Sequence, residues 1–335
     1  MDTSRRKVLS GILTSAPAML LLRQANTWAA SAPSSLPASS IEGGLASFAN
    51  GQHDATAVIQ AIVDAAASQA TVASIPAGKF LINPDIGIVL HSGSRLVLSP
   101  QTRLIARPSR SANYGIVRLY EIDNASVMGG QIIGERTNHL GKGGEWGMGI
   151  DIRGSTNITI SNVTVSNCWG DGFYIGMGPK NHQPCRNITF EHVTSINNRR
   201  QGLSIVGCIG AKILNSTFNG TNGTSPQAGI DLEPNTKDPV KQILIRNCTA
   251  ADNAGAGIQT HNHLSDVTIE NCQISGNTQA GISLRGVTKN VTVQNNTIAN
   301  SRGYGIYVGK HAKQHTIKAN TINTSILGKR MKIDQ

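Results

Sequence analysis

The stretch GAGIQTHNHLSDVTIENCQISGNTQAGISL, residues 255–284, contains one complete unit of a repeat and the start of the next. It opens with Gly-Ala-Gly-Ile at 255–258, continues through the alternating segment Val-Thr-Ile at 267–269, and reaches a second Gly-Ile at 281–282. Alternating apolar and polar residues are typical of β-strands, and Asn, Gly and Ser between such segments favour turns. The unit therefore predicts short strands joined by tight turns.

The same phrase recurs through the second half of the chain as GMGIDI, GDGFYI, RQGLSI, QAGIDL, GAGIQT, QAGISL and GYGIYV. Its shared glycine falls at Gly149, Gly172, Gly202, Gly229, Gly257, Gly281 and Gly305. Successive glycines are 23, 30, 27, 28, 24 and 24 residues apart, which leaves room for two or three short strands and none for a crossover helix. Propeller blades need about 40 residues, and the signature of leucine-rich repeats is absent. The repeats predict an all-β fold, a single-stranded right-handed parallel β-helix of about 10 coils.

A column of polar residues supports this stacking of coils. The residues at one repeat position are mostly asparagines, with one His and one Ala as substitutes: Asn162, His192, Asn215, Asn247, Asn271, Asn295 and Ala319. Adjacent coils lie about 4.8 Å apart, so we expect these amides to form hydrogen bonds from coil to coil. Cys248 and Cys272 also fall in register, which is compatible with a disulfide or with stacked buried thiols.

The N-terminal part of the domain predicts a helix that covers the open end of the stack. The segment DATAVIQAIVDAAAS, residues 54–68, has apolar residues at helical spacing, with Asp54 as its candidate N-cap. Together with the following ASIPAGKFLI, residues 73–82, it resembles the opening of pectate-lyase-like superfamily proteins. The later coils resemble bacterial right-handed β-helix repeat proteins. The resemblance covers about residues 50–325 and implies a fold rather than an activity, because the superfamily contains lyases, glycoside hydrolases, epimerases and phage tailspikes.

The first residues predict export. Arg5, Arg6 and Lys7 precede a modestly apolar run and small residues, as in a twin-arginine signal peptide. A membrane anchor is disfavoured because Pro17 and Arg23 interrupt the run, so we expect no integral membrane segment in the mature chain. The expected location is periplasmic or secreted. The predicted organisation is a signal peptide at 1–32, a linker at 33–48, the β-helix domain at 49–326 and a basic C-terminal tail at 327–335.

The charge balance favours an anionic partner. The formal net charge is +11, and it remains +8 without residues 1–30, which hold four Lys or Arg and one Asp. Such a balance suits an acidic polysaccharide, nucleic acid or an anionic envelope surface, although lineage and solubility would explain it equally. Nucleic acid is not expected, because no nucleic-acid-binding motif is present and the polar positions include carboxylates. The pattern does not predict an oligomeric state.

Residues at alternate positions after each glycine are expected to point away from the core. The second positions form one outward column: Asp151, Tyr174, Ser204, Asp231, Gln259, Ser283 and Tyr307. The fourth positions form another: Arg153, Gly176, Val206, Glu233, His261, Arg285 and Gly309. No other face of the repeat concentrates carboxylates, a histidine, arginines and tyrosines in this way, so we expect the substrate groove along these columns.

Asp231 and Glu233 lie two apart on one strand and share a face. Such a pair of carboxylates can divide the acid and base roles of glycoside hydrolysis, with Asp171 assisting, and this gives a first hypothesis. In a second, a lyase or C5-epimerase acts on a uronate: Tyr174 or His261 removes a proton while an arginine neutralises the sugar carboxylate. The third is a non-catalytic glycan-binding or envelope protein. Ion pairs from the two carboxylates to His261, an arginine or a loop lysine are the structural alternative.

Other side chains near the columns are candidates for substrate binding. Arginines at these places suit sugar carboxylates or sulfates, and tryptophans suit sugar rings, although a solvated turn or turn packing would explain them equally. The predicted substrate-binding residues are Arg199, Arg200, Asn235, Arg285, Arg153, Trp146 and Trp169.

The catalytic motifs of related enzymes do not carry over. The chain lacks the adjacent Asp-Asp pair and Gly-His-Gly of polygalacturonases, and the Asp-Pro-His-Asp of mannuronan epimerases. It also has no dense acidic cluster like that of pectate lyases, so we predict no metal site and no cofactor, with calcium left open. The site assignment therefore rests on the two outward columns alone.

Overall fold

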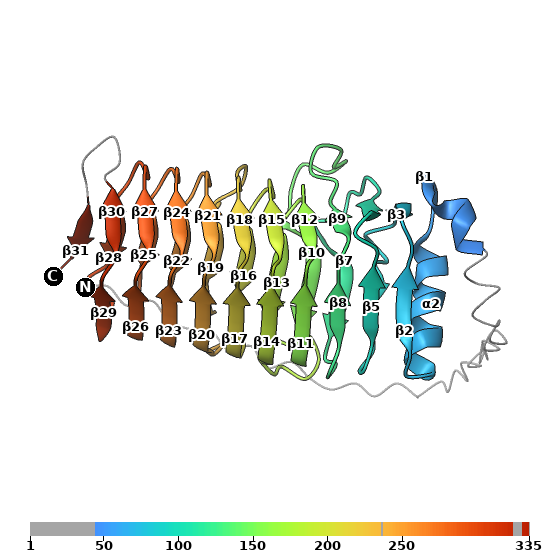
Figure 1. The fold of residues 1–335 in the computed structure, drawn as a ribbon, viewed down its shortest axis with the longest axis horizontal. Coiled ribbons are helices and arrows are strands. Elements are labelled where there is room, and N and C mark those ends of the chain that lie inside the picture. The colour runs from blue at the N-terminus through green and yellow to red at the C-terminus, as the bar shows by residue number, and fades with distance from the viewer. Residues whose placement is uncertain (1–43, 236, 324–329, 335) are drawn as a thin grey trace, which may run out of the picture. The chain divides into compact units, whose positions relative to one another are not determined.

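The computed structural model describes residues 44–235, 237–323 and 330–334, and in this part the strands form three parallel sheets (Figure 1). Each coil contributes one strand to each sheet, and the sheets contain 11, 10 and 10 strands. Strands of successive coils pair in parallel register throughout. The predicted right-handed parallel β-helix of about 10 coils is confirmed.

The first sheet contains β1 (Asn50–Asp54), β3 (Gly78–Ile82), β6 (Thr102–Ala106), β9 (Gln131–Ile133), β12 (Thr164–Ser166), β15 (Thr194–Ile196), β18 (Thr217–Asn219), β21 (Thr249–Ala251), β24 (Gln273–Ser275), β27 (Thr297–Ala299) and β30 (Thr321–Asn323). The second contains β2 (Val72–Ile75), β5 (Arg95–Leu98), β8 (Ser126–Met128), β11 (Thr156–Ser161), β14 (Cys185–Glu191), β17 (Cys208–Leu214), β20 (Val240–Arg246), β23 (Leu264–Glu270), β26 (Thr288–Gln294) and β29 (His315–Lys318). The third contains β4 (Ile88–Val89), β7 (Asn113–Tyr120), β10 (Trp146–Arg153), β13 (Phe173–Gly176), β16 (Leu203–Ile205), β19 (Ile230–Leu232), β22 (Ile258–Thr260), β25 (Ile282–Leu284), β28 (Ile306–Val308) and β31 (Met331–Ile333).

The core consists of aliphatic side chains stacked from coil to coil. Ile230, Ile258, Ile282 and Ile306 are register neighbours on the third sheet, and all four are fully buried. Each such side chain contributes about 1.5–3 kcal/mol on burial, and β-branched side chains pack well on a pleated surface. The first and third positions after each repeat glycine therefore point inward, as the alternation predicts.

The predicted asparagine column has a different main role from the one expected. All seven of its members have φ between 51° and 56°, at the corner between the second and first sheets. Asparagine adopts this left-handed conformation more readily than most other residues, which explains its recurrence there. Among the described residues one hydrogen bond joins side-chain amides of the column: Asn247 donates to Asn215 at 3.1 Å. Buried amides stack elsewhere, as in the 3.0 Å bond from Asn253 to Asn277.

The predicted N-terminal helix is confirmed as α2 (Thr56–Ser68), which lies at the N-terminal end of the stack after the short 3-10 helix η1 (Ala46–Phe48) (Figure 1). Ile59 and Val63 on its inner face are buried. The cap prediction is corrected by one residue, because Ala55 is the N-cap. Asp54 still accepts hydrogen bonds from the backbone N–H and hydroxyl of Thr56, at 3.0 and 2.5 Å.

The predicted domain ends fare differently. The signal peptide at 1–32 and most of the linker at 33–48 lie outside the described residues. The basic tail prediction at 327–335 needs correction, because β31 pairs in parallel with β28 and extends the third sheet. Met331, Lys332 and Ile333 show the alternation of a strand, but the segment is too short and too basic to be recognised as one from the sequence.

All five cysteines, Cys248 and Cys272 included, are buried free thiols. No helix in the described part of the chain has the length and apolarity needed to cross a membrane.

Candidate functional site

The third sheet carries both predicted outward columns, and its strand register aligns them. Tyr174, Ser204, Asp231, Gln259 and Ser283 are direct neighbours on successive strands. Five members of the first column are buried, however, whereas the two tyrosines are partly exposed; the buried ones are Asp151, Ser204, Asp231, Gln259 and Ser283. The expectation that Asp231 faces a substrate is therefore corrected: its side chain is 0% exposed.

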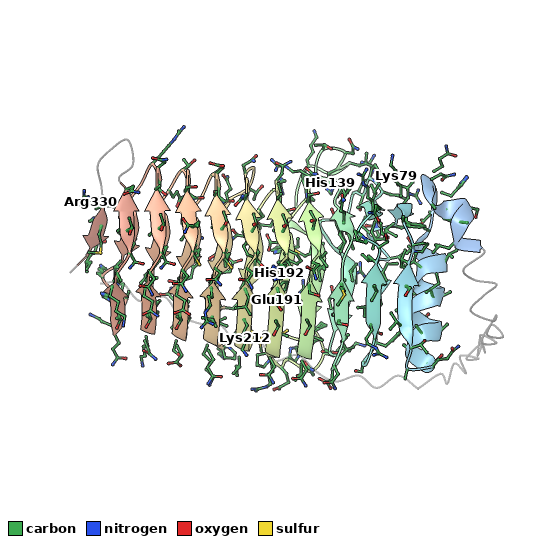
Figure 2. All side chains as sticks on the ribbon, in the orientation of Figure 1. Lys79, His139, Glu191, His192, Lys212 and Arg330 are labelled. Carbon is green, nitrogen blue, oxygen red and sulfur yellow. The ribbon has the colours of Figure 1, made fainter. Side chains whose placement is uncertain are left out.

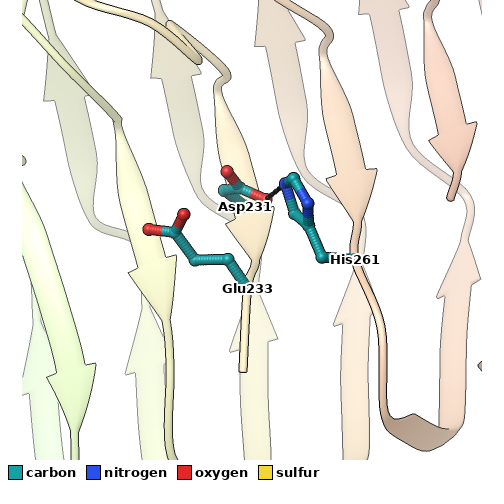
Figure 3. A group of neighbouring side chains, drawn as sticks. All are labelled: Asp231, Glu233 and His261. Carbon is teal, nitrogen blue, oxygen red and sulfur yellow. Dashed lines mark ion pairs between the residues drawn. The ribbon is translucent and has the colours of Figure 1, made fainter. Parts of the chain in front are cut away.

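Asp231 lies beneath His261 and orients it (Figure 3). Its Oδ2 accepts hydrogen bonds from the amides of Gln201 and Gln259, at 2.6 and 2.8 Å. Oδ1 has no well-aligned hydrogen bond, and His261 Nε2 lies 3.2 Å from it. His261 Nε2 also lies 3.2 Å from the Gln259 amide nitrogen, so it donates to Asp231 in one tautomer and accepts from Gln259 in the other. The His261 side chain is 37% exposed and can meet a ligand, and in the first tautomer Nδ1 is the nitrogen without a proton.

The pKa of His261 is raised above 6.5, chiefly by its hydrogen bond to Asp231, against the effect of burial. Glu233 also raises it, and Arg285 lowers it. The positive form thus contributes stability that is fully present below pH 6.5 and is lost as pH rises through the folded-state pKa.

We expect Asp231→Asn to lower the pKa of His261, so that the NMR signals of its ring protons titrate with a midpoint at lower pH. An unchanged titration would show that Asp231 does not hold the imidazole.

Arg200 joins three carboxylates on the N-terminal side of His261. Its guanidinium forms two contacts with the Glu233 carboxylate, at 2.9 and 3.1 Å. It also pairs with Asp171 and with Glu145, at 3.2 Å each. The Arg200 side chain is only 12% exposed and that of Glu233 19%. Such a fork geometry is strong and directional. Arg200 was predicted to bind substrate, but its donors are already engaged by protein carboxylates.

The buried carboxyl of Asp171 has a pKa above the ordinary value of an aspartate. Burial raises its pKa to about 7, Arg200 opposes that rise, and Glu233 adds to it. The hydroxyl of Ser204 donates to Asp171 at 2.7 Å. Because the folded-state pKa is raised, the stability tied to this group is fully present below pH 3.8 and falls as pH rises towards 7. The carboxyl is fully buried, so it positions Arg200 rather than contacting a ligand.

Arg199 and Trp169 serve the packing of the nearby turn. The Arg199 guanidinium lies 3.8 Å from the Trp169 ring, and His139 stacks on the same ring at 3.8 Å. Arg199 also donates to the carbonyls of Gly144 and Trp169, at 3.0 and 3.2 Å. His139 marks the loop after β9 in Figure 2. Both predicted substrate-binding residues thus pack within this turn, while the buried Trp169 Nε1 has no hydrogen-bond partner.

The remaining predicted residues lie apart from His261. Arg153 pairs with buried Asp151 at 2.8 Å and covers the ring of Tyr174 at 4.6 Å, so the phenol of Tyr174 lies under a guanidinium. Asn235 donates to Asp238 at 2.8 Å in the exposed turn after β19. Trp146, 46% exposed at the start of β10, keeps a surface open to a ligand. Elsewhere, Lys212 on the second sheet and His192 at its corner with the first sheet are exposed polar side chains (Figure 2).

Arg285, one coil beyond His261, is exposed and has neutral partners. Its guanidinium donates to Ser283 Oγ at 3.0 Å and to Gln279 Oε1 at 3.3 Å. The sequence analysis did not identify Gln201 or Glu145 as part of the site. Gln201 enters from a turn and Glu145 from a loop, so neither shares the strand alternation that identified the columns.

Asp231, Glu233 and His261 each offer one ligand atom within 4.8 Å of the others, a spacing that a metal ion could use (Figure 3). The donor set does not suit calcium, which takes six to eight oxygen ligands. Arg200 already grips Glu233, and two amides donate to Asp231. The arrangement favours an acid–base role over metal binding.

The fold and this site define a β-helix protein with a cluster of acidic and basic side chains on its third sheet. The family described as "Right handed beta helix region" matches residues 79–238 and 239–322, and the chain belongs to this family. The SPbeta prophage-derived uncharacterized protein YorA of Bacillus subtilis is 28% identical over 233 residues, 60% of this chain and 40% of YorA. The chain thus spans about two fifths of the length of the curated relatives it matches.

Solved structures with the same fold include two enzymes that act on polysaccharides. The A-module of the mannuronan C-5 epimerase AlgE4 from Azotobacter vinelandii has a TM-score of 0.57 and 18% identity, covering 87% of this chain and 99% of the module. A 1,3-alpha-1,4-beta-D-galactose-4-sulfate-3,6-anhydro-D-galactose-2-sulfate 4 galactohydrolase has a TM-score of 0.65 and 13% identity, covering 87% and 89%. At these identities the likeness establishes the fold alone.

Proposed function

We propose that this protein modifies an acidic, uronate-containing polysaccharide by removing the proton next to the sugar carboxylate. The observation that carries the proposal is the buried Asp231 beneath a partly exposed His261. A partly exposed imidazole beside a buried carboxylate suits proton transfer near neutral pH. The basic charge of the chain and the polysaccharide substrates of the two structural neighbours support the substrate class.

In the proposed reaction, neutral His261 takes the C5 proton of a uronate on Nδ1. The negative charge that develops spreads into the sugar carboxylate, where the exposed guanidinium of Arg285 stabilises it. In elimination the C4–O bond then breaks, a C4=C5 double bond forms, and the leaving oxygen takes the proton. In epimerisation water delivers a proton to C5 on the opposite face, and His261 returns its own proton to water. Both outcomes start from the same step.

Analysis of products by mass spectrometry, together with proton NMR for epimerisation, which leaves the mass unchanged, tests this proposal. The protein is incubated with polygalacturonate, with alginate and with a glucuronate-containing capsular polysaccharide, and the expected products are unsaturated oligosaccharides or an epimerised polymer. Oligosaccharides that have gained a water would contradict proton abstraction. An unchanged polymer across the panel would contradict an enzymatic role and favour glycan binding alone.

A second candidate, hydrolysis, is favoured by the raised pKa of Glu233, which comes from burial and from the nearby charge of Asp231. A carboxyl group with a raised pKa stays protonated and can serve as a general acid. Glu145, joined to Glu233 through Arg200, would be its partner instead of the buried Asp231. In this case Glu233→Gln should abolish the products that contain an added water.

Export of the chain would bring it to such a substrate. We propose that residues 1–32 direct it to the periplasm or to the outside of the cell, where acidic polysaccharides are found. Replacement of Arg5 and Arg6 by Lys should then retain the protein inside cells, which fractionation and immunoblotting would detect.

A further inference from the structure

A shallow pocket of about 470 Å³ lies on the third sheet, beyond Arg285 towards the C-terminal end of the stack. It is lined by Gln279, Ala280, Arg285, Gly303, Tyr304 and Tyr307. We propose that this pocket is a second subsite for the polysaccharide, which binds one acidic sugar residue through two tyrosine rings and two cations. The ligand class rests on the proposed function, whereas the pocket itself does not.

The aromatic part of the pocket is fixed in place. The rings of Tyr304 and Tyr307 lie 6.2 Å apart at an angle of 30°, and the hydroxyl of Tyr307 donates to Asp334 at 2.6 Å. Tyrosine combines a rigid apolar face with a polar edge, which suits the C–H face and hydroxyl groups of a sugar. The two rings thus form a platform on which a sugar residue can stack.

The cationic part selects for negative charge. The Arg285 guanidinium lies 6.0 Å from the Tyr307 ring centroid, and Lys332 Nζ lies 6.0 Å from both ring centroids. Among the described residues, the carboxylate that contacts this group is that of Asp334, 2.9 Å from Lys332. Two cations against one carboxylate leave a net positive charge beside the rings. A sugar carboxylate or sulfate would complement it.

The pocket also lies in line with the proposed proton-transfer group. Ser283, Tyr307 and Lys332 are register neighbours on β25, β28 and β31. Tyr307 is therefore two coils from Gln259, the neighbour of His261, or about 10 Å along the stack. A polysaccharide that lies along the coil axis would meet His261 and this pocket at different residues of the same chain.

Equilibrium binding tests the subsite without requiring turnover. Calorimetric titrations with oligogalacturonates of increasing length are carried out on the full chain in a His261→Gln background. We expect Lys332→Gln to weaken binding of the longer oligomers about tenfold, the size of one lost charge-assisted contact. Tyr304→Ala should weaken binding similarly, whereas Tyr304→Phe, which retains the ring, should not.

Matched controls separate this idea from the proposed function. Lys289→Gln, an exposed lysine on β26 of another sheet, should leave binding unchanged. Carboxyl-reduced, neutral oligomers should lose their sensitivity to Lys332→Gln but keep that to Tyr304→Ala. Wild-type binding by both the Lys332 and Tyr304 variants would overturn the subsite, even if the enzyme proved active. Weakened binding in a protein without turnover would support the subsite and contradict the proposed function.

Discussion

Replacement of His261 by glutamine is expected to lower turnover of an acidic polysaccharide by about 1000-fold, within the range that acid–base catalysis supplies. Glutamine retains a hydrogen-bonding side chain beside Asp231 but cannot accept and release a proton near neutral pH. The thermal midpoint should change little, because the imidazole is partly exposed. The measurement is the initial rate of product formation on the most active polysaccharide.

His311→Gln is the matched control, because His311 is exposed in the turn after β28 and has no part in the proposed chemistry. It should retain wild-type activity. If His261→Gln were as active as the control while Glu233→Gln lost activity, the acid–base role would belong to Glu233 and the hydrolase would replace the present proposal.

Removal of Arg200 is expected to produce the largest loss of stability. Arg200→Met leaves the buried carboxyl of Asp171 and the largely covered one of Glu233 without their common partner. Breaking a buried ion pair from one side costs about 3–5 kcal/mol at a pH where the remaining groups are charged. The free energy of unfolding from urea titrations at pH 8 should fall by this amount.

The same loss should shrink at acidic pH, where both carboxyls become protonated. The pKa of Asp171 is about 7 with Arg200 in place, and Arg200 lowers it, so removal of Arg200 raises this pKa further. For Asp171 the recovery is therefore expected as pH falls towards 7 and should be complete below it. Arg186→Met, an exposed arginine on β14, is the control and should change stability by less than about 0.5 kcal/mol. If Arg200→Met lowered the free energy of unfolding as little as the control does, or by an amount independent of pH, the ion pairs of Arg200 would contribute little to stability.

The fold was predictable because it depends on local, repeated rules. Inward isoleucines such as Ile258 recur with the glycines, and helix α2 is predicted by the spacing of its apolar residues. The corner asparagines were found as a column, but their backbone conformation was not predicted. Residues 331–333 were missed because a single short strand at the end of a chain has no repeat to identify it.

The site was predictable in its register but not in its burial. Strand alternation correctly placed Asp231 and Glu233 on the outer side of the sheet, next to His261 in the following coil. Alternation does not show that side chains from turns, such as Arg200 and Gln201, fold over that surface and cover Asp231. The difference turned an expected pair of carboxylates into an aspartate–histidine pair, which changed the favoured chemistry.

The fate of the C5 proton is the most direct test of the central claim. Proton NMR follows a uronate polysaccharide in heavy water during incubation with the protein. The account predicts that the C5–H signal of the modified residues disappears, through elimination or through exchange, and that His261→Gln prevents this. New chain ends with every C5–H signal intact would contradict it.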